Sequence, residues 1–576
     1  MISVDNIIEQ QLPSLHNNTL FARPIKAILR KLLHEREFQA FEQAYPHLKG
    51  LDFIEQVLDY FDFTYSVSSK EKERIPSSGR VVIIANHPIG SLDGLALLKL
   101  ISEIRPDVKA VANDMLMAIS PLRSMLLPVN NMQGNTPKDN LKNINKHLAN
   151  EGAVIIFPAG EVSRLRPNGI KDTAWNSGFY RIAKAAKAPI LPIFVDGKNS
   201  AIFYSASMLY KPLATALLVR EMFKQQKKNV AVRIGEAIEF DSYSDQQFPR
   251  KTIIRLFKKH LYRLATNKSG LFKTQTAIAQ PEQRQVLKAA LEACQLLGQT
   301  QDGKKIYLYQ HSESSPIMRE IGRLREIAFR AVGEGSGLKR DIDKYDAYYY
   351  HLILWDQQDL EIVGAYRFAD AQKVMAEQGK SALYTHSLFS YQPEMDNYLA
   401  QGLELGRSFI QPKYWGKRSL DYLWFGIGAF LHKNPQCRYL FGPVSMSNSF
   451  PQTAKDLMVY FYNLYFGYPE KIAESPEPYQ YQQLALTDLK QTFVGEDYQA
   501  DFTQLKHLLA NIGVSVPTLY KQYSELCHQG GVNFLAFGVD PDFNHCVDGL
   551  VLVDTHQLKD KKRQRYIDSH GASETE

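Results

Sequence analysis

Short apolar runs rich in β-branched residues alternate with helical segments along the first half of this 576-residue chain. The strand-like runs lie at 81–85, 154–157, 190–195 and 230–234, and helical spacing is found at 95–104 and 174–188. Strands that alternate with helices are typical of an α/β domain, in which the sheet is covered by crossover helices. The pattern predicts such a domain, with its functional residues at the strand ends.

A second set of elements follows a polar stretch. A helix is expected at 317–331, a glycine-rich loop at 333–337 and another helix at 419–432. Strands are expected at 351–355, 361–368, 383–388, 403–410 and 438–441. Because no internal repeat relates the two halves, the sequence predicts two different α/β domains. We place them at residues 1–280 and 305–576, with a linker at 281–304.

Charge and cysteine content limit the classes of partner. Lys and Arg number 68 and Asp and Glu 61, a surplus that suits an anionic membrane or an acidic carrier protein and is too small to indicate nucleic acid. Four cysteines without C-x-x-C spacing favour neither a zinc ribbon nor a disulfide framework. The first residues do not resemble a signal peptide, and no apolar run is long enough to span a bilayer. We therefore expect a cytoplasmic protein whose membrane contact is interfacial.

Two amphipathic segments carry clustered basic residues, at 20–33 and 208–228. Either could lie on anionic lipid. Each could equally pack on its own domain with its basic face in solvent.

The first candidate site follows the strand at 81–85. His87 stands at the strand end, and Asp93 stands at the start of the next helix. A histidine titrates near neutrality and can take a proton from an attacking hydroxyl, while a carboxylate on its other nitrogen fixes the tautomer. Because the chain has 15 histidines, this spacing also arises by chance, and a structural turn histidine is the competing interpretation.

Three blocks put His87 in a wider pattern: NHPIGSLDG at 86–94, FPAGEVSR at 157–164 and APILPIFV at 188–195. In this order they resemble the glycerolipid acyltransferase family, over about residues 60–240. The resemblance implies that His87 is the general base and that Asp93 orients it. The residues it implies for the acceptor site are Asn86, Gly160, Glu161 and Arg164.

Two departures from the family pattern occur, one in the spacing of the His87–Asp93 pair and one in the acceptor loop. Five residues separate His87 from Asp93 where the family usually has four, and Val162 stands where the family has an arginine that grips a phosphate. The resemblance therefore implies a lyso-lipid acceptor other than a glycerol phosphate. Arg164 and Arg166 are candidates for binding a carboxylate or phosphate, with solvated loop arginines as the alternative.

Blocks of the second half also occur in a recognisable order. They are LR at 324–325, DKYD at 343–346, EIVGAYRF at 361–368, ELGRS at 404–408 and RYLFGPVSMS at 438–447. They resemble acyltransferases of the GNAT superfamily, particularly the N-acyltransferases that make ornithine lipids. Acylation of an amine requires a group that receives the amine proton, and Glu404 is the candidate base or orienter.

Arg407 lies three residues after Glu404, so on a regular strand the two side chains face opposite sides. The resemblance implies a β-bulge there, which would bring them together. Asp343 and Asp346, paired with Arg367, are candidates for binding the amino acid together with Arg407, and a structural ion-pair cluster is the alternative. The candidates for the phosphate of the acyl donor precede a helix and are Lys413, Gly416, Lys417 and Arg418. A solvated turn is the alternative for this segment.

The two resemblances together imply a bifunctional enzyme of ornithine lipid synthesis. The second domain would join a 3-hydroxyacyl group to the amine of ornithine, and the first would esterify the 3-hydroxyl of that lyso-lipid. Acyl carrier protein, or else coenzyme A, would supply both acyl groups, and no metal or redox cofactor is called for. The expected location is the cytoplasmic face of a bacterial inner membrane.

Two alternatives stay open at this point. The amine could be glycine or another amino acid, which the sequence does not decide. Alternatively, the chain could be a lysophospholipid acyltransferase whose second domain is a non-catalytic module that binds an acyl group or its carrier.

Overall fold

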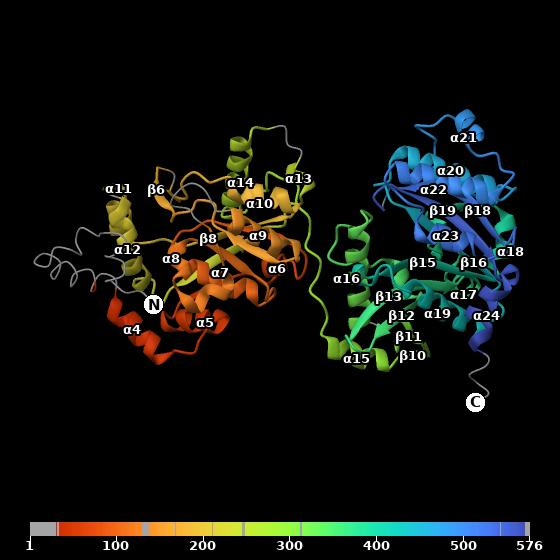
Figure 1. Cartoon of the computed structure of the whole chain (residues 1–576). Coiled ribbons are helices and arrows are strands. Elements are labelled where there is room, and N and C mark those ends of the chain that lie inside the picture. The colour runs from red at the N-terminus through yellow and green to blue at the C-terminus, as the bar shows by residue number, and fades with distance from the viewer. Residues whose placement is uncertain are drawn as a thin grey trace, which may run out of the picture. The chain divides into compact units, whose positions relative to one another are not determined.

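The computed structural model divides the chain into two compact units, Met1–Gln280 and Pro281–Glu576 (Figure 1). It describes residue 30 and residues 34–570, apart from 91, 130–137, 168, 210, 245–247, 312–313 and 542. The basic segment at 20–33 therefore lies almost wholly outside the described residues. The one at 208–228 forms the end of helix α11 and helix α12. Within the described part, no helix is long and apolar enough to cross a bilayer.

The first unit is built on a seven-stranded sheet with the order β1-β9-β8-β2-β5-β3-β4. Its strands are β1 (Thr64–Ser66), β2 (Val81–Ala85), β3 (Lys109–Ala112), β4 (Leu126–Pro128), β5 (Ala153–Ile156), β8 (Ile190–Asp196) and β9 (Asn229–Ile234). All neighbours are parallel except β8 and β9. A separate hairpin joins β6 (Arg164–Arg166) and β7 (Gly169–Lys171).

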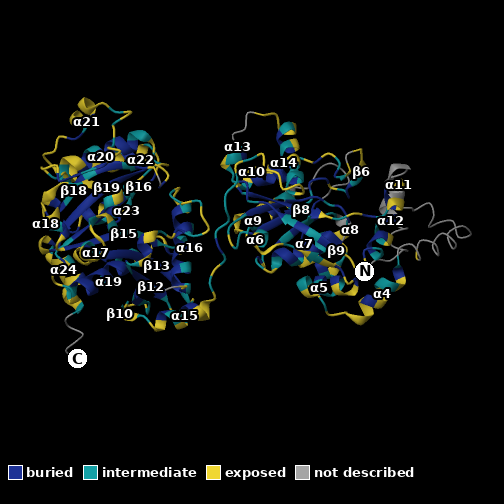
Figure 2. Ribbon diagram, turned by 180° about the vertical axis from the view of Figure 1, so that it is seen from behind, coloured by how far each residue is buried: buried dark blue, intermediate teal, exposed yellow. Residues whose placement is uncertain are grey.

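The helices of this unit are α4 (Glu35–Ala44), α5 (Gly50–Tyr60), α6 (Ser69–Lys72), α7 (Leu92–Ser102), α8 (Asp114–Met117), α9 (Lys138–Ala149), α10 (Gly178–Ala186), α11 (Ala201–Leu209), α12 (Lys211–Phe223), α13 (Asp241–Ser244) and α14 (Arg250–Leu264). The sheet is buried between helices (Figure 2). Val81 and Ile83 belong to the core on one face, and Val82 and Ile84 to the core on the other. Side chains of a strand alternate in direction, so β2 must be apolar throughout to fill both cores.

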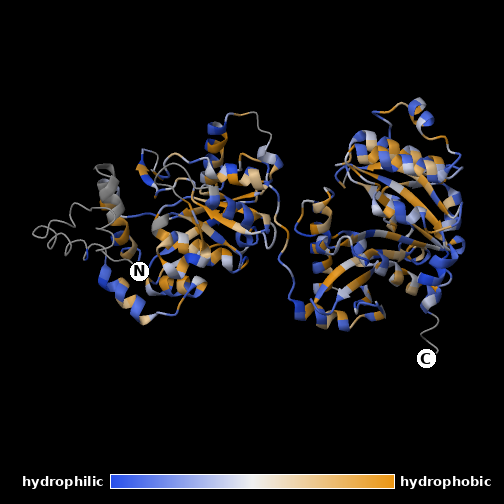
Figure 3. Ribbon diagram, viewed as in Figure 1, coloured by the Kyte–Doolittle hydropathy of each residue, from blue (hydrophilic) through white to orange (hydrophobic). Residues whose placement is uncertain are grey.

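The second unit contains an eight-stranded sheet with the order β10-β11-β12-β13-β15-β16-β19-β18. Its strands are β10 (Gln295–Gln299), β11 (Lys305–Gln310), β12 (Tyr350–Asp356), β13 (Glu361–Asp370), β15 (Gly402–Ile410), β16 (Tyr439–Met446), β18 (Val532–Asp540) and β19 (Cys546–Asp554). A small pair is formed by β14 (Ser390–Tyr391) and β17 (Ala473–Glu474). Figure 3 shows apolar strands beside helices of mixed hydropathy.

The helices of the second unit are α15 (Arg284–Glu292), α16 (Pro316–Ala331), α17 (Ala371–Gln378), α18 (Asp396–Leu399), α19 (Ser419–Lys433), α20 (Gln452–Phe466), α21 (Leu486–Thr492), α22 (Tyr498–Asn511), α23 (Thr518–Ser524) and α24 (Asp560–Tyr566). The structure differs from expectation at 281–304, where α15 and β10 replace a linker. Leu287 and Leu291 of α15 are buried in the core around α16, and β10 pairs with β11. Apolar contacts therefore tie this segment to the second unit.

A second difference concerns 383–388, which was expected to be a strand. The segment forms short 3-10 turns at Lys380–Ala382 and Thr385–Ser387. The backbone amides of Tyr384 and Thr385 donate hydrogen bonds to the carboxylate of Glu404. Because these donors are engaged by a buried side chain, the segment wraps around Glu404 and does not join the sheet.

The expected bulge in β15 is confirmed. Ala365 pairs with Phe409 but Arg367 pairs with Gly406, so two residues of β15 face one of β13. Arg407 has φ of 47°, which lies in the left-handed region. The bulge brings Arg407 to the face of the sheet that carries Glu404 and Arg367.

The parallel strands β15 and β16 pair only over three residues, from Gly402 with Tyr439 to Glu404 with Phe441. Beyond this point β15 continues along β13 and β16 along β19, so the two strands part. Gly442 lies where they part, and a Cβ atom there would stand 2.0 Å from the carbonyl oxygen of Leu405. Only glycine fits this close approach of two backbones.

We therefore expect Gly442→Ala to lower the free energy of unfolding by about 1 to 3 kcal/mol, because the added methyl group must push two strands apart. Denaturant unfolding of the full chain measures the change. Gly298→Ala is the matched control, since nothing lies within 4 Å of the position of its Cβ atom. An unchanged stability of Gly442→Ala would contradict the close approach.

Candidate active sites

His87 and Asp93 meet beside the end of β2. Asp93 lies in the first turn of α7, and its Oδ2 atom is 3.2 Å from Nδ1 of His87. The backbone amides of Ile89, Gly90 and Gly94 also donate hydrogen bonds to Asp93, at 2.9, 3.1 and 2.9 Å. Asp93 is fully buried, whereas 18% of the His87 side chain remains exposed. The loop therefore wraps around the carboxylate and leaves the histidine ring partly open.

The pair changes the pKa of both groups. Burial by itself lowers the pKa of His87, but the facing carboxylate of Asp93 outweighs this and raises the pKa above its usual value. Burial by itself raises the pKa of Asp93, but His87 and the backbone amides outweigh this and lower the pKa. The imidazolium form is thus stabilised, as a base that receives a proton requires.

Asp172 connects the loops around His87, and the sequence analysis missed it. Its Oδ1 atom accepts hydrogen bonds from the hydroxyl of Ser163 at 2.5 Å and from the backbone amide of His87 at 3.3 Å. Its Oδ2 atom accepts one from Trp175 at 2.8 Å. The amide of Ser163 donates to the carbonyl of His87 at 2.8 Å. Asp172 lies 85 residues after His87, so no local sequence pattern indicates that the two residues are in contact.

The four residues predicted to bind the acceptor differ from one another in their contacts. The side-chain amide of Asn86 donates to the carbonyl of Val195 through its nitrogen and accepts from the amide of Val195 through its oxygen, so that it joins the end of β2 to β8. Gly160 has φ of 66° and forms a turn. Glu161 pairs with Arg164 at 3.1 Å. The Nε and Nη1 atoms of Arg164 are buried and have no hydrogen-bond partner among the described residues.

Glu404 is enclosed by donors in the second unit. Its carboxylate accepts hydrogen bonds from the amides of Thr385 and Tyr384, at 2.6 and 3.2 Å, and from the hydroxyls of Thr385 and Tyr349. Burial raises the pKa of Glu404 above its usual value, although these donors oppose the shift. A carboxylate with four donors suits the role of an orienter better than that of a mobile base. Tyr349, Tyr384 and Thr385 were not identified from the sequence.

Arg367 and Arg407 lie on the same face of the sheet as Glu404. Arg367 contacts Asp343 at 2.5 Å and Asp346 at 3.0 Å, and Asp346 also binds Arg325 at 2.8 Å. Asp343 and Asp346 are further occupied in a capping box. Their carboxylates are therefore satisfied, which leaves them little capacity for a ligand amine.

Free hydrogen-bonding capacity in this cluster is found on the arginines and on Asp341, whose buried Oδ2 atom has no hydrogen-bond partner among the described residues and lies 3.9 Å from Nε of Arg407. Within the described ranges, Nε and Nη2 of Arg367 and Nε of Arg407 are buried without an acceptor. The Arg407 guanidinium lies 4.6 Å from the ring of Phe543 and 5.4 Å from that of Tyr384, and its distance from Asp343 is 3.7 Å. Unsatisfied guanidinium groups favour an anionic ligand such as a carboxylate.

The predicted donor-binding residues precede α19 and do not form one basic cluster. Lys413 pairs with Glu361, and Arg418 pairs with Asp421 at 3.4 Å. Lys417 is exposed and lies 5.0 Å from the ring of Tyr414. Gly416 has φ of 75°, which allows the turn before the helix. Lys417 and the amides at the start of α19 are therefore the parts of this segment that suit a phosphate.

Both halves of the chain are similar to known protein families. Residues 7–268 match the family described as acyltransferase, and residues 324–425 match the acetyltransferase (GNAT) domain. The chain is 32% identical to a glycine N(alpha)-acyltransferase of Bacteroides thetaiotaomicron, over 51% of this chain and 91% of that protein. It is 28% identical to a lyso-glycine lipid O-acyltransferase of the same organism, over 43% and 92%.

A third similarity covers less of both proteins. The chain is 28% identical to an L-ornithine N(alpha)-acyltransferase of Brucella abortus, over 23% of this chain and 50% of that protein. The chain belongs to the acyltransferases, with an acyltransferase domain in its first half and a GNAT domain in its second. It is an acyltransferase enzyme, and the predicted α/β fold class and both family resemblances are confirmed.

The contact between His87 and Asp93 predicts that Asp93→Asn lowers the pKa of His87, because the opposite charge is lost. NMR titration of the histidine ring measures this shift. Since a raised pKa contributes stability below about pH 6.5 that is lost as pH rises through the folded value, the variant should lose more stability at pH 6 than at pH 9. Asp52→Asn, which changes an exposed carboxylate of α5, is the control. An unshifted His87 would disprove the pairing.

Proposed function

We propose that the chain makes a glycine lipid in two acyl transfers. The second unit joins a 3-hydroxyacyl group to the amine of glycine, and the first unit esterifies the 3-hydroxyl of the product. The observation that carries this proposal is the pair of similarities to proteins of one organism, named for N-acylation of glycine and for O-acylation of lyso-glycine lipid. Each is matched over at least 91% of its length.

Glycine replaces ornithine as the preferred amine. The L-ornithine N(alpha)-acyltransferase is matched over only 50% of its length, against 91% for the glycine N(alpha)-acyltransferase.

In the first unit, His87 takes the proton of the lipid hydroxyl while the hydroxyl oxygen attacks the thioester carbonyl carbon. The C–O bond forms, the C–S bond breaks, and the imidazolium returns the proton to the leaving thiolate. Asp93 keeps Nδ1 protonated, so that the opposite ring nitrogen can act as the base. The exposed part of the ring gives the acceptor access.

In the second unit, Arg367 and Arg407 bind the glycine carboxylate with their free N–H groups. The glycine ammonium group first loses a proton to water, and the neutral nitrogen then attacks the thioester carbonyl carbon. The C–N bond forms, the C–S bond breaks, and the second amine proton passes through water to the leaving thiolate. Glu404 positions Tyr349, Tyr384 and Thr385 around the bound amino acid. Lys417 and the start of α19 bind the phosphate of an acyl carrier protein or of coenzyme A. The enzyme acts at the cytoplasmic face of the inner membrane, where its one-chain intermediate partitions into lipid.

Lipid analysis tests both steps. We expect the intact chain, expressed in a bacterium without amino-acid lipids, to produce a two-chain glycine lipid, measured by mass spectrometry. His87→Ala should accumulate the one-chain N-acylglycine, because general-base catalysis contributes about 10²- to 10⁴-fold. Glu404→Gln should reduce both lipids, since its site acts first.

His47→Ala, which removes an exposed histidine of the same unit, should leave the lipids unchanged. A two-chain lipid made by His87→Ala would refute the role of His87. A two-chain lipid that contains ornithine would refute glycine as the amine. A chain that acylates only lysophospholipids would favour the non-catalytic alternative for the second unit.

Arg164 supplies a further element of the O-acyl step. Its two buried N–H groups without a partner lie next to Ser163, whose amide binds the backbone of His87. Val162, which stands where related enzymes have a phosphate-binding arginine, is buried in an apolar cluster with Phe203 and Leu217. An N-acylglycine offers one carboxylate and no phosphate. We propose that Arg164 binds this carboxylate.

Arg164→Gln should raise the KM for N-(3-hydroxyacyl)glycine about 10- to 100-fold, because a hydrogen-bonded charge pair is lost. It should not change the KM for the methyl ester of the same acceptor. Assays of the purified full chain with both acceptors give the comparison, and Arg166→Gln on the same hairpin is the control. Equal losses with the acid and the ester would show that Arg164 is structural only.

A further inference from the structure

The backbone of His87 is held on both sides by residues at the open end of the β6–β7 hairpin. The amide of His87 donates a hydrogen bond to Oδ1 of Asp172 at 3.3 Å, and the carbonyl of His87 accepts one from the amide of Ser163 at 2.8 Å. The hydroxyl of Ser163 donates to the same Oδ1 atom at 2.5 Å. These three hydrogen bonds join His87, Ser163 and Asp172 in a closed ring.

The register of the hairpin explains why these two residues act together. Arg164 of β6 pairs with Lys171 of β7, so Ser163 and Asp172 are the next residues beyond this pair. Both are buried. Because paired residues of antiparallel strands lie side by side, two residues that are nine positions apart in the sequence can hold one histidine.

The ring of His87 is held by two other residues. Its centroid lies 4.1 Å from that of the Phe157 ring, at an interplanar angle of 30°. Its Nδ1 atom lies 3.2 Å from Oδ2 of Asp93. The ring and the backbone of the candidate base are thus fixed by different residues, and a base fixed in this way needs little reorganisation before it takes a proton.

Asp172 is a buried carboxylate whose hydrogen-bond donors are neutral. Its Oδ2 atom accepts from the indole of Trp175 at 2.8 Å, and its Oδ1 atom accepts from a hydroxyl and a backbone amide. The ammonium group of Lys258 binds the backbone carbonyls of residues 172 and 173, at 2.6 and 2.7 Å, rather than this carboxylate. Burial lowers the pKa of His87, whereas the charges of Asp93 and then Asp172 raise it. The charge of Asp172 therefore favours the imidazolium form.

We propose that Asp172 is a positioning residue for the O-acyl step, which holds the backbone of His87 and stabilises its imidazolium form. This inference rests on the proposed function. Arg164, to which we assign the acceptor carboxylate, follows Ser163 directly in the chain. One short hairpin thus connects the group that binds the acceptor to the base that activates its hydroxyl.

Kinetics of the purified full chain test the proposal, with N-(3-hydroxyacyl)glycine as acceptor and a carrier-bound acyl donor. Asp172→Asn keeps one oxygen for Ser163 and His87 but removes the charge. We expect kcat for O-acylation to fall about 10- to 100-fold while the KM for the acceptor changes less than about twofold, because the base and not the acceptor site is disturbed. The rising limb of kcat against pH should move to lower pH, since loss of a negative charge lowers the pKa of the base.

The other charged groups around this loop stay unchanged in the variant. They are Asp93, Lys258 and the pair of Glu161 with Arg164. A shift of the pH profile therefore reports the charge of Asp172.

Ser163→Ala makes the complementary change, because it removes the hydroxyl and keeps the charge of Asp172. Its kcat should fall with the KM for the acceptor unchanged, and the limb of its pH profile should stay in place. If Asp172→Asn does not fold, this variant carries the comparison of kcat with KM, and an unchanged kcat would then contradict the proposal.

Tyr243→Phe is the structural control. It removes a buried hydroxyl of the same unit, which donates to the carbonyl of Ala188 at 2.6 Å. Its kcat, KM and pH profile should equal those of the intact chain, even where its Tm falls. Equal losses of kcat in Tyr243→Phe and Asp172→Asn would show that general loosening of the unit, and not the position of His87, determines the rate.

The remaining outcomes separate this inference from the proposed function. Asp172→Asn with the kcat and pH profile of the intact chain would overturn the role of Asp172 and leave the proposed function standing. A lower kcat with an unmoved pH profile would support the backbone contact and refute the effect of the charge. The absence of O-acylation by the intact chain would overturn both the inference and the proposed function.

Discussion

Buried carboxylates organise both candidate sites, because an ionised carboxylate can leave water only where donors replace its hydration. Asp93 accepts hydrogen bonds from backbone amides of the loop after β2, and its carboxylate faces His87. Glu404 accepts hydrogen bonds from the backbone amides of Tyr384 and Thr385, which belong to one turn. In each case an irregular segment of the chain folds around a carboxylate on a helix or strand, because the buried carboxylate needs hydrogen-bond donors. The loops that could bind substrate are held in place by this requirement.

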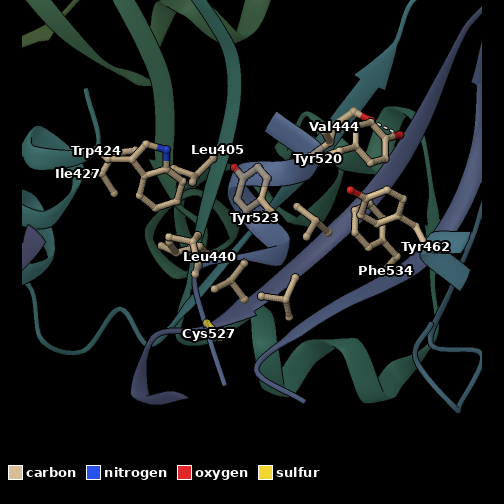
Figure 4. Packing of buried hydrophobic residues seen from close by; sticks show 14 of the residues in the cluster. Leu405, Trp424, Ile427, Leu440, Val444, Tyr462, Tyr520, Tyr523, Cys527 and Phe534 are labelled. Carbon is tan, nitrogen blue, oxygen red and sulfur yellow. Dashed lines mark hydrogen bonds between the residues drawn. The ribbon is translucent and has the colours of Figure 1, made fainter. Parts of the chain in front are cut away.

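The two faces of the sheet in the second unit carry different kinds of side chain. One face carries the buried charges, where Arg367 and Arg407 keep unused N–H groups. The other face is an aromatic core, whose polar atoms include the hydroxyls of several tyrosines and the indole nitrogen of Trp424 (Figure 4). The bulge in β15 turns Arg407 toward the charges, and β15 and β16 stop pairing after Glu404 and Phe441.

The proposed function joins the two units through one intermediate. The acceptor for the first unit carries a carboxylate and a hydroxyl, and both come from the reaction assigned to the second unit. Arg164 is suited to the carboxylate, and His87 to the hydroxyl. A chain that contains both activities yields a complete two-chain lipid from one amino acid and two acyl donors.

The sequence by itself determined the regular elements, the pairing partners His87 and Asp93, and the two acyltransferase resemblances, because apolar periodicity and short motifs are local features. It did not determine the turn at 383–388, the role of Asp172 or the satisfied state of Asp343 and Asp346. These depend on hydrogen bonds between residues up to 85 positions apart. Only the tertiary structure decided which buried polar groups have hydrogen-bond partners and which, like those of Arg164 and Arg367, are left without one. The physical reason is that satisfaction of a buried group depends on what the fold brings beside it.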